Sequence, residues 1–201
     1  QEFEVAWYGK PPPPTKTIKG LHYAPDWLSF ADQQVLLSAI DGAPWSNVLR
    51  RRVQHYGYRY DYRQRSIQAD MQVGPLPAWT KIIQQRLVAA GWFTASPDQM
   101  IVNEYLPGQG IAPHVDCEPC FKDTIVSISL GAPACMDFSR INTAEKRTQL
   151  LLPGSLLVLQ KDARYAWQHS IPARKSDTLH GLRKPRQRRV SLTFRQVILN
   201  A

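Results

Sequence analysis

Two stretches in the first half of the chain repeat their hydrophobic residues at helical spacing. Residues 29–40, SFADQQVLLSAI, begin with a serine that can cap a helix, and apolar residues follow three to four positions apart. Residues 76–92, LPAWTKIIQQRLVAAGW, carry a proline near the start and a glycine near the end of a second such repeat. The pattern predicts two helices.

Other stretches of this half have different patterns. Residues 10–15, KPPPPT, predict an extended connector of polyproline type. Residues 53–62, VQHYGYRYDY, alternate aromatic and polar residues, which predicts a β-hairpin with Gly57 near its turn.

From about residue 99 the chain becomes a series of short β-rich runs separated by proline and glycine. The runs are QMIVNEYL, DTIVSISLG, CMDFSR, TQLLLPGSLLVLQ and RRVSLTFRQVIL. Strands at this spacing are typical of a jelly-roll sandwich or barrel. We therefore expect a mainly β protein with N-terminal helices (α+β), a single domain over 1–201 with an N-terminal extension at 1–98 and a jelly-roll core at 99–201. Residues 177–187, DTLHGLRKPRQ, predict a flexible basic loop.

The charge of the chain favours a polyanionic partner over most other classes. The 201 residues include 25 Lys plus Arg against 16 acids, a net charge of +9. Basic residues cluster at 50–65 and again at 174–189, which suits nucleic-acid phosphates. The alternative is a soluble protein that happens to be basic.

Cysteine usage and hydropathy predict the compartment. Three cysteines, an odd number, make a disulfide framework unlikely and favour a reducing compartment. We find no signal peptide and no apolar run long enough to cross a membrane. These features predict a monomer in the cytoplasm, or in the nucleus of a eukaryotic cell.

The stretch PHVDCEPC at 113–120 offers two kinds of chemistry. His114 and Asp116 form an H-x-D, whose side chains share one side of an extended segment and can point at one metal ion. A third ligand would come from another strand, and His169 in YAWQHSIP follows a strand-like run.

The competing possibility is C-x-x-C chemistry at Cys117 and Cys120. A zinc site needs a second pair of ligands, and Cys135 is the only other cysteine. A redox C-x-x-C prefers a helix N-terminus in a βαβ unit, which the pattern lacks. We therefore interpret both cysteines as loop residues.

Two arginines in the last strand-like run point to an anionic ligand. Arg189 and Arg195 are separated by an even number of residues, so they project to one face of the predicted strand. Inward-facing arginines need anions, because an unpaired buried charge is very costly, and a dicarboxylate would supply them. The alternative is a surface strand with two solvated arginines.

In order and spacing, NEYLPGQGIAPHVD, DTIVSISLG, MDF, WQHSI and RRVSLTFR resemble the AlkB family of Fe(II)/2-oxoglutarate dioxygenases. The resemblance implies a double-stranded β-helix fold, with Fe(II) as cofactor and 2-oxoglutarate and O2 as co-substrates. It implies iron ligands at His114, Asp116 and His169. It also implies that Arg189 binds the distal carboxylate of 2-oxoglutarate, Arg195 its proximal end, and that Asn103 and Tyr105 hydrogen-bond it.

The same resemblance implies where a nucleobase would lie. In AlkB-like enzymes a segment before the β core covers the base, and here it corresponds to RRRVQHYGYRYDYRQR at 50–65. Its basic residues and tyrosines suit phosphate contacts and base stacking. The candidate substrate contacts are Arg51, Tyr56, Tyr58 and Arg59, joined by Tyr60, Tyr62 and, past the H-x-D, Glu118. The alternative is that the tyrosines simply pack on the helices.

Several motifs are closer to the eukaryotic branch that hydroxylates a modified wobble uridine in transfer RNA. That branch carries an RNA-recognition module and a methyltransferase domain, for which this chain has no room. We therefore expect demethylation of N-alkylated bases such as 1-methyladenine and 3-methylcytosine in DNA or RNA, as repair of alkylation damage. The alternatives are wobble-uridine hydroxylation, a dioxygenase acting on a protein or small molecule, and a non-catalytic binding module.

Overall fold

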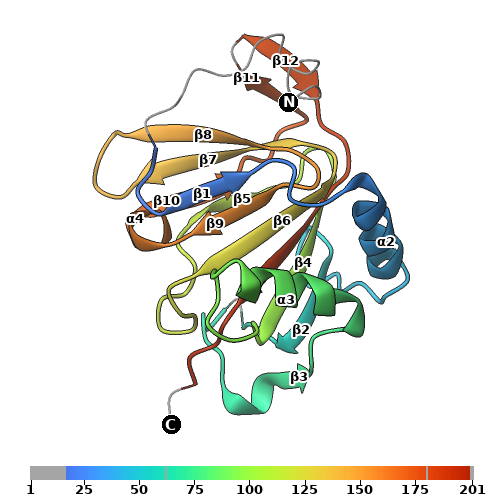
Figure 1. Cartoon of the computed structure of the whole chain (residues 1–201). Helices are drawn as coiled ribbons and strands as arrows, with labels where there is room; N and C mark the ends of the chain where they lie inside the picture. The colour runs from blue at the N-terminus through green and yellow to red at the C-terminus, as the bar shows by residue number, and fades with distance from the viewer. Residues whose placement is uncertain (1–16, 62, 180, 200–201) are drawn as a thin grey trace.

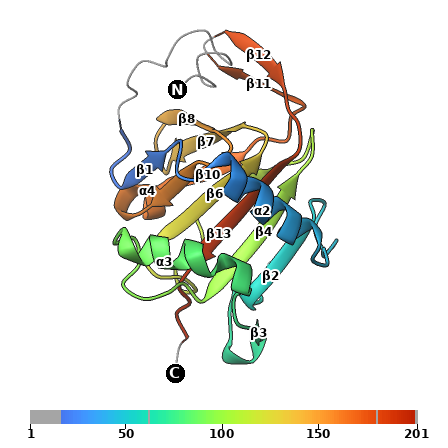
Figure 2. The ribbon, with the colours of Figure 1, turned by 45° about the vertical axis from the view of Figure 1, so that its right-hand side comes forward.

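Two antiparallel sheets face each other across a shared interior in the computed structural model, which describes residues 17–61, 63–179 and 181–199. The major sheet has seven strands in the order β1-β9-β6-β13-β4-β2-β3 (Figures 1 and 2). Their bounds are β1 Leu21–Ala24, β9 Leu156–Leu159, β6 Ile125–Gly131, β13 Arg189–Arg195, β4 Gln99–Tyr105, β2 Val53–Tyr58 and β3 Gln72–Gly74. The connector expected at 10–15, Tyr62 and His180 lie outside the described residues.

The minor sheet has four strands in the order β5-β10-β7-β8, and a separate two-stranded hairpin projects beside it. The bounds of these strands are β5 Ile111–His114, β10 Trp167–Ile171, β7 Ala134–Arg140, β8 Lys146–Leu151, β11 Ser176–Leu179 and β12 Leu182–Pro185. The β-rich runs recognised in the sequence all form strands of the two facing sheets. This arrangement confirms the expected mainly β jelly roll.

Two helices cover the outer face of the major sheet (Figures 1 and 2). Helix α2 (Phe30–Asp41) begins as predicted, because the Ser29 side chain accepts a hydrogen bond from the Asp32 amide at 3.1 Å. Helix α3 (Lys81–Ala89) begins later than predicted, since a 3₁₀ turn, η2 (Ala78–Thr80), follows Pro77. The short elements η1 (Ala69–Met71) and α4 (Lys161–Tyr165) lie in connections.

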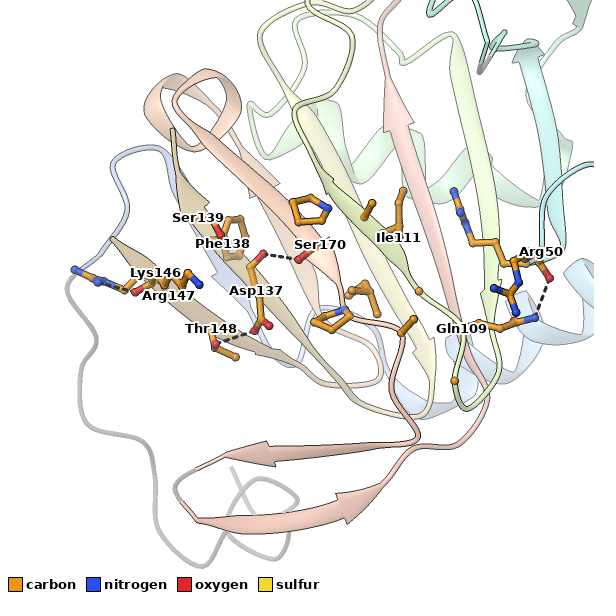
Figure 3. Close-up of a pocket in the computed structure, with 18 residues that line it drawn as sticks. Arg50, Gln109, Ile111, Asp137, Phe138, Ser139, Lys146, Arg147, Thr148 and Ser170 are labelled. Atoms are coloured by element: carbon orange, nitrogen blue, oxygen red, sulfur yellow. Dashed lines mark hydrogen bonds between the residues drawn. The ribbon is translucent and has the colours of Figure 1, made fainter. Parts of the chain in front are cut away.

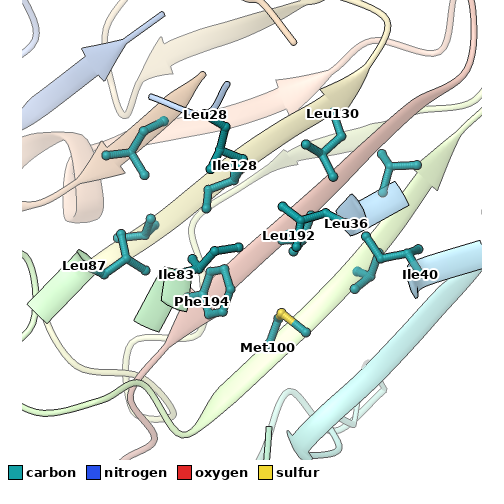
Figure 4. Close-up of a cluster of buried hydrophobic side chains, with 14 of the residues drawn as sticks. Leu28, Leu36, Ile40, Ile83, Leu87, Met100, Ile128, Leu130, Leu192 and Phe194 are labelled. Atoms are coloured by element: carbon teal, nitrogen blue, oxygen red, sulfur yellow. The ribbon is translucent and has the colours of Figure 1, made fainter. Parts of the chain in front are cut away.

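Strand β13 separates two hydrophobic layers. Its even positions Val190, Leu192 and Phe194 are fully buried in a cluster with side chains of α2 and α3 (Figure 4). Its odd positions face the interior between the sheets, where the guanidinium groups of Arg189 and Arg195 lie over aromatic rings. The prediction that Arg189 and Arg195 project to one inward face of this strand is therefore confirmed.

The hairpin expected at 53–62 is wrong. Residues 53–58 form one strand, β2, which pairs with β4 on one side and with β3 on the other. Gly57 lies inside this strand at φ +78°, next to a register shift, and a Cβ there would lie 1.8 Å from the Asp98 carbonyl oxygen. The glycine therefore marks a bulge and a close backbone approach, because only a residue without a Cβ fits.

The flexible loop expected at 177–187 is also wrong, because residues 176–179 (β11) pair with residues 182–185 (β12). The buried carboxylate of Asp177 accepts one hydrogen bond from Arg174, two from Arg186 and one from the Cys135 amide. These bonds attach the base of the hairpin to β7, and the arginine hydrogen bonds keep the pKa of Asp177 below its ordinary value although burial alone would raise it. Strands β1, β2 and β3 come from the region expected to be an N-terminal extension, and they extend the major sheet.

Replacing Gly57 by alanine is expected to destabilise the fold by about 3 kcal/mol, since it adds a backbone clash to an unfavourable φ. Gly74→Ala is the matched control: Gly74 also has positive φ, at +109°, but no atom lies within 4 Å of its added Cβ. This control should lose only about 1 kcal/mol. Urea unfolding followed by circular dichroism measures both, and equal losses would contradict the clash at Asp98.

Candidate functional site

Three possible metal ligands converge between the two sheets. His114 ends β5 and His169 lies on β10, and antiparallel pairing sets the two residues directly opposite each other. Asp116 follows two residues after His114. Its Oδ1 atom lies 3.4 Å from Nε2 of His114 and 3.7 Å from Nε2 of His169. One ligand atom from each of these three residues lies within 4.8 Å of the other two, so all three can bind the same metal ion.

Both histidines present Nε2 to this point. Nδ1 of His114 lies 2.8 Å from the Ala112 carbonyl oxygen, so Nδ1 carries a proton and Nε2 is the ring nitrogen that faces Asp116. Burial, reinforced by the neighbouring His114, lowers the pKa of His169 to about 3. Neutral imidazole is the form that binds transition metals.

Asp116 is held as a carboxylate. Burial alone would raise its pKa, but the guanidinium of Arg195 keeps the pKa well below its ordinary value. Arg195 donates from Nε to Oδ2 of Asp116 at 2.8 Å and from Nη1 to Oε1 of Gln99 at 3.2 Å. Because Arg195 occupies Oδ2, Oδ1 is the oxygen available for a metal ion.

Two imidazoles and one carboxylate, all on one side of a point, fit Fe(II) with open positions on the other side. The donor set contains no thiolate, since Cys117 and Cys120 are bonded to each other. The sequence predicts no disulfide framework and indicates loop residues at both cysteines, and it does not anticipate this local pair. The two residues lie 5.2 Å apart between Cα atoms in a tight turn, and such a local pair needs no wider disulfide framework.

A buried arginine provides the second anchor of the site. Arg189 is 2 % exposed and donates from Nη2 to Oγ of Ser129 at 2.9 Å, while its Nε atom is buried without a hydrogen-bond partner. Burial lowers its pKa. No carboxylate within residues 17–61, 63–179 and 181–199 forms an ion pair with it. An unpaired buried cation is costly, and a carboxylate of a bound ligand would supply the missing partner.

Asn103 and Tyr105 lie beside this anchor. They occupy odd positions of β4, and the β4–β13 register sets Tyr105 opposite Arg189 and Asn103 opposite Ser191. The guanidinium carbon of Arg189 lies 5.3 Å from the centre of the Tyr105 ring. Oδ1 of Asn103 accepts a hydrogen bond from Nε of Arg51 at 3.0 Å.

A cavity of about 410 Å³ opens at two of the candidate ligands, His114 and Asp116. Besides His114 and Asp116, the side chains that line it include Arg51, Tyr60, Arg65, Asn103, Phe121 and Arg195. Of the substrate contacts named from the sequence, Arg51 and Tyr60 line this cavity.

The other candidate substrate contacts lie elsewhere. Tyr56 packs edge-on against Trp79 and donates to Gln54, as expected of a tyrosine that packs on the helices. Tyr58 packs against the hydrophobic cluster between the sheets. Arg59 lines a neighbouring hollow of about 680 Å³ together with Tyr60. Glu118 is exposed and does not line the cavity. The substrate roles of these four stay predictions.

A wider groove, of about 930 Å³, runs across the minor sheet and meets the cavity at Arg51 (Figure 3). Arg50 and Gln109 lie at one end and Lys146 and Arg147 at the other, with Asp137 between them. The groove therefore carries positive charge at both ends.

Sequence reasoning missed Arg164. This arginine is 2 % exposed and donates to three main-chain carbonyls of the ligand loop, those of Asp116 at 2.9 Å, Cys117 at 3.3 Å and Phe121 at 3.4 Å. A single arginine beside a short helix has no periodic signal, so only the fold reveals its partners. It fixes the main chain that carries Asp116.

Comparison with known proteins agrees with this geometry. The family described as 2OG-Fe(II) oxygenase superfamily matches residues 44–195. The chain is 36% identical over 203 residues to the Alkylated DNA repair protein ALKBH8 homolog of Arabidopsis thaliana, covering 90% of this chain and 59% of the relative. It is 31% identical over 217 residues to the Probable RNA/DNA demethylase ALKBH6 of Danio rerio, covering 94% and 88%.

The chain spans only part of some relatives. It is 36% identical to the Xenopus tropicalis tRNA (carboxymethyluridine(34)-5-O)-methyltransferase alkbh8, covering 80% of this chain but 26% of that protein. The solved structure of OsALKBH1 has a TM-score of 0.68 at 21% identity and covers 88% of this chain and 96% of its own, which supports the fold. Among the described residues, no helix is both long and apolar enough to span a membrane.

The match over residues 44–195, and relatives above 30% identity across most of the chain, agree with the facing histidines and the carboxylate between them. The chain belongs to the 2OG-Fe(II) oxygenase superfamily and, within it, to the AlkB family, so it is a dioxygenase that uses Fe(II), 2-oxoglutarate and O2.

Proposed function

We propose that this dioxygenase removes methyl groups from N-alkylated bases of the 1-methyladenine and 3-methylcytosine type in DNA or RNA, as repair of alkylation damage. The observation that carries the proposal is the junction at Arg51, where the cavity at the candidate iron ligands meets a groove with basic ends. A base in the cavity would have its phosphate backbone along that groove.

In this proposal His114, Asp116 and His169 bind Fe(II), and Arg189, Asn103, Tyr105 and Arg195 hold 2-oxoglutarate. The bound iron and co-substrate supply the oxidising chemistry that hydroxylates a substrate C–H bond while 2-oxoglutarate loses CO2 and becomes succinate. An N-hydroxymethyl base then breaks down to formaldehyde and the repaired base. The protein holds the ligands on one side and leaves the opposite side open to substrate.

Arg195 has two tasks here. In the structure Arg195 donates hydrogen bonds to Asp116 and Gln99. It therefore already holds Oδ2 of Asp116, the oxygen that is not available for the metal ion. Its predicted contact with the proximal end of 2-oxoglutarate would be additional to that pair. Arg189 has no such competing partner among the described residues, and we assign it the distal carboxylate.

A base inside a duplex cannot reach this cavity, so the substrate is a flipped-out or single-stranded base. Tyr60 lines the cavity and offers a ring for stacking, and Arg51 offers a cation beside it. Arg50 and Lys146 are exposed at opposite ends of the groove and suit phosphates.

Hydroxylation of a modified wobble uridine in transfer RNA is the second candidate. The identity to the Xenopus tropicalis relative, whose name gives a transfer-RNA activity, favours it. The similarity to the Danio rerio protein named a probable RNA/DNA demethylase, which covers 94% of this chain, favours the first candidate.

The protein is expected to release succinate when given Fe(II), 2-oxoglutarate and an oligonucleotide carrying 1-methyladenine or 3-methylcytosine. Mass spectrometry of the oligonucleotide should show loss of a methyl group. Gain of one oxygen on a modified uridine would instead select the second candidate. The unmodified oligonucleotide is the control, and no dependence on any of these nucleic acids would refute both candidates.

Replacing Arg189 by methionine should weaken 2-oxoglutarate binding by roughly 100-fold, because one partner of a buried charge pair is lost. Mn(II), used as a probe of the metal site, should bind as before. Arg188→Met is the matched control, since the neighbouring arginine pairs with Asp41 and Glu104 at the other side of the sheet. Titration calorimetry measures both ligands, and equal 2-oxoglutarate affinities in the two variants would contradict the assignment.

Each of Arg50→Gln and Lys146→Gln should weaken oligonucleotide binding and reduce the slope of log K against log salt by about 0.7 to 0.9, the contribution of one phosphate contact. Lys81→Gln removes the same charge from α3, on the helix-covered face, and should leave the slope unchanged. Fluorescence anisotropy at several salt concentrations measures the slopes. If Lys81→Gln reduced the slope by as much, oligonucleotide binding would depend on the net charge of the protein and not on the groove.

A further inference from the structure

The disulfide follows directly after the candidate iron ligand Asp116 and is in contact with the main chain at Arg65. Cys117 follows Asp116, and both Cys117 and Cys120 are buried. The main-chain carbonyl oxygen of Arg65 lies 3.1 Å from Sγ of Cys117 and 3.3 Å from Sγ of Cys120. The same carbonyl oxygen therefore contacts both sulfur atoms.

Arg65 contacts the same loop through its side chain. Its Nη2 atom donates to the Val115 carbonyl oxygen at 3.2 Å. Its backbone has φ +50°, in the left-handed region that residues other than glycine rarely adopt. Such a conformation persists where surrounding contacts favour it, and the contacts here are with the segment that carries the iron ligand.

The two redox states of the cysteines offer Arg65 different partners. A disulfide sulfur carries no hydrogen, so in the bonded state the two short approaches are contacts between sulfur and oxygen without a donor. In the reduced state each sulfur carries an S–H group that can donate to the carbonyl. On reduction the two sulfur atoms move apart to van der Waals distance, and each S–H group can then donate to the Arg65 carbonyl in place of the present contact.

The turn that holds the cysteines does not depend on the disulfide. The amides of Cys120 and Phe121 both donate to the Cys117 carbonyl, at 3.3 and 3.2 Å, and the Cys120 carbonyl accepts from the Ile198 amide at 2.9 Å. Arg164 holds the Asp116 and Cys117 carbonyls from below. The main chain at Asp116 is therefore fixed by bonds that are the same in either redox state.

We propose that Cys117 and Cys120 are a reversible redox-modification site, and that their state sets how firmly Arg65 is anchored over the iron site. The dithiol anchors Arg65 through two S–H donors, and the disulfide releases it. In the oxidising step two S–H bonds break and one S–S bond forms. The two electrons and two protons pass to a small-molecule disulfide, which becomes two thiols through a mixed-disulfide intermediate.

The consequence for the site follows from where Arg65 lies. Arg65 and Tyr60 line the cavity at His114 and Asp116, and the Tyr60 ring packs on Phe121 at 5.9 Å between centroids. Releasing Arg65 makes the side of the cavity formed by Arg65 and Tyr60 more mobile, and a bound base would contact this side. The metal ligands stay in place. This consequence rests on the proposed function, whereas the anchoring itself does not.

Two double variants separate the donors from the covalent bond. Cys117→Ser with Cys120→Ser keeps two donors and cannot form a disulfide, so it should behave as the reduced protein. Cys117→Ala with Cys120→Ala has neither donors nor a disulfide, and should behave as the oxidised protein. Cys135 remains in both, and intact mass after alkylation under denaturing conditions reports whether one or three of the wild-type cysteines are free.

The first measurement is amide hydrogen exchange of residues 63–67 in the full chain with Mn(II) bound. The oxidised wild type and the alanine pair should exchange roughly fivefold faster than the reduced wild type and the serine pair, as expected from the loss of weak hydrogen bonds. Mn(II) affinity should agree in all four. Equal exchange in the four proteins, or an alanine pair that matches the serine pair, would overturn the proposal.

The second measurement is the KM for a methylated oligonucleotide, which should rise by a similar factor in the two fast-exchanging proteins while the KM for 2-oxoglutarate stays constant. If exchange responds to redox state but no protein acts on any oligonucleotide, the proposed function fails and the anchoring proposal stands. If all four turn over the oligonucleotide with equal exchange rates and equal KM, the proposed function stands and the anchoring proposal fails.

Discussion

The alternation of side chains along β13 is the constraint on which the rest of the structure depends. Its even positions are apolar and lie under α2 and α3, and this requires its odd positions to face the minor sheet. Those odd positions include both arginines of the site. A shift of one residue in the pairing of β13 with β4 or β6 would bring the arginines under the helices and the leucine and phenylalanine into the cavity. The hydrophobic core therefore fixes the direction of the catalytic face.

The two arginines of β13 differ in whether the protein supplies them with a carboxylate partner. Asp116 forms an ion pair with Arg195. The loop that carries Asp116 is held by hydrogen bonds from Arg164 to its main-chain carbonyls. Arg189 has a hydroxyl and a ring beside it but no acid within the described residues. One arginine is thus neutralised by the protein, and the other is left for a ligand. This difference explains why a single strand can serve both the metal ligand and the co-substrate.

Much of this arrangement could be predicted from the sequence, where local pattern and residue type decide it. The strands after residue 99, the helix capped by Ser29 and the opposed faces of β13 all follow from periodicity, and the H-x-D with His169 followed from a resemblance. What failed depended on contacts distant in sequence. Gly57 was read as a turn glycine because the sequence cannot show the Asp98 carbonyl against it. The basic run at 177–187 was read as a loop because the fold alone brings Asp177 against Arg174, Arg186 and the Cys135 amide.

The same distance in sequence separates the tyrosines. Tyr56, Tyr58 and Tyr60 look equivalent in an alternating run, yet the bulge at Gly57 and the end of β2 direct them to different surroundings, and Tyr60 is the one that lines the cavity. Arg164 and Arg65 were likewise indistinguishable from other basic residues, because their partners are main-chain carbonyls, which leave no trace in residue types.

The direct pairing of His114 with His169 has a consequence for how the protein acquires its metal. The two histidines come from strands far apart in sequence, β5 and β10, so the site depends on a long-range pairing that exists only when the minor sheet has formed. The unfolded chain cannot bring the ligands together, and a metal ion will therefore select the native state. Occupancy adds a stabilisation that grows with the logarithm of free metal concentration, so the lifetime of this protein in a cell is coupled to the iron supply.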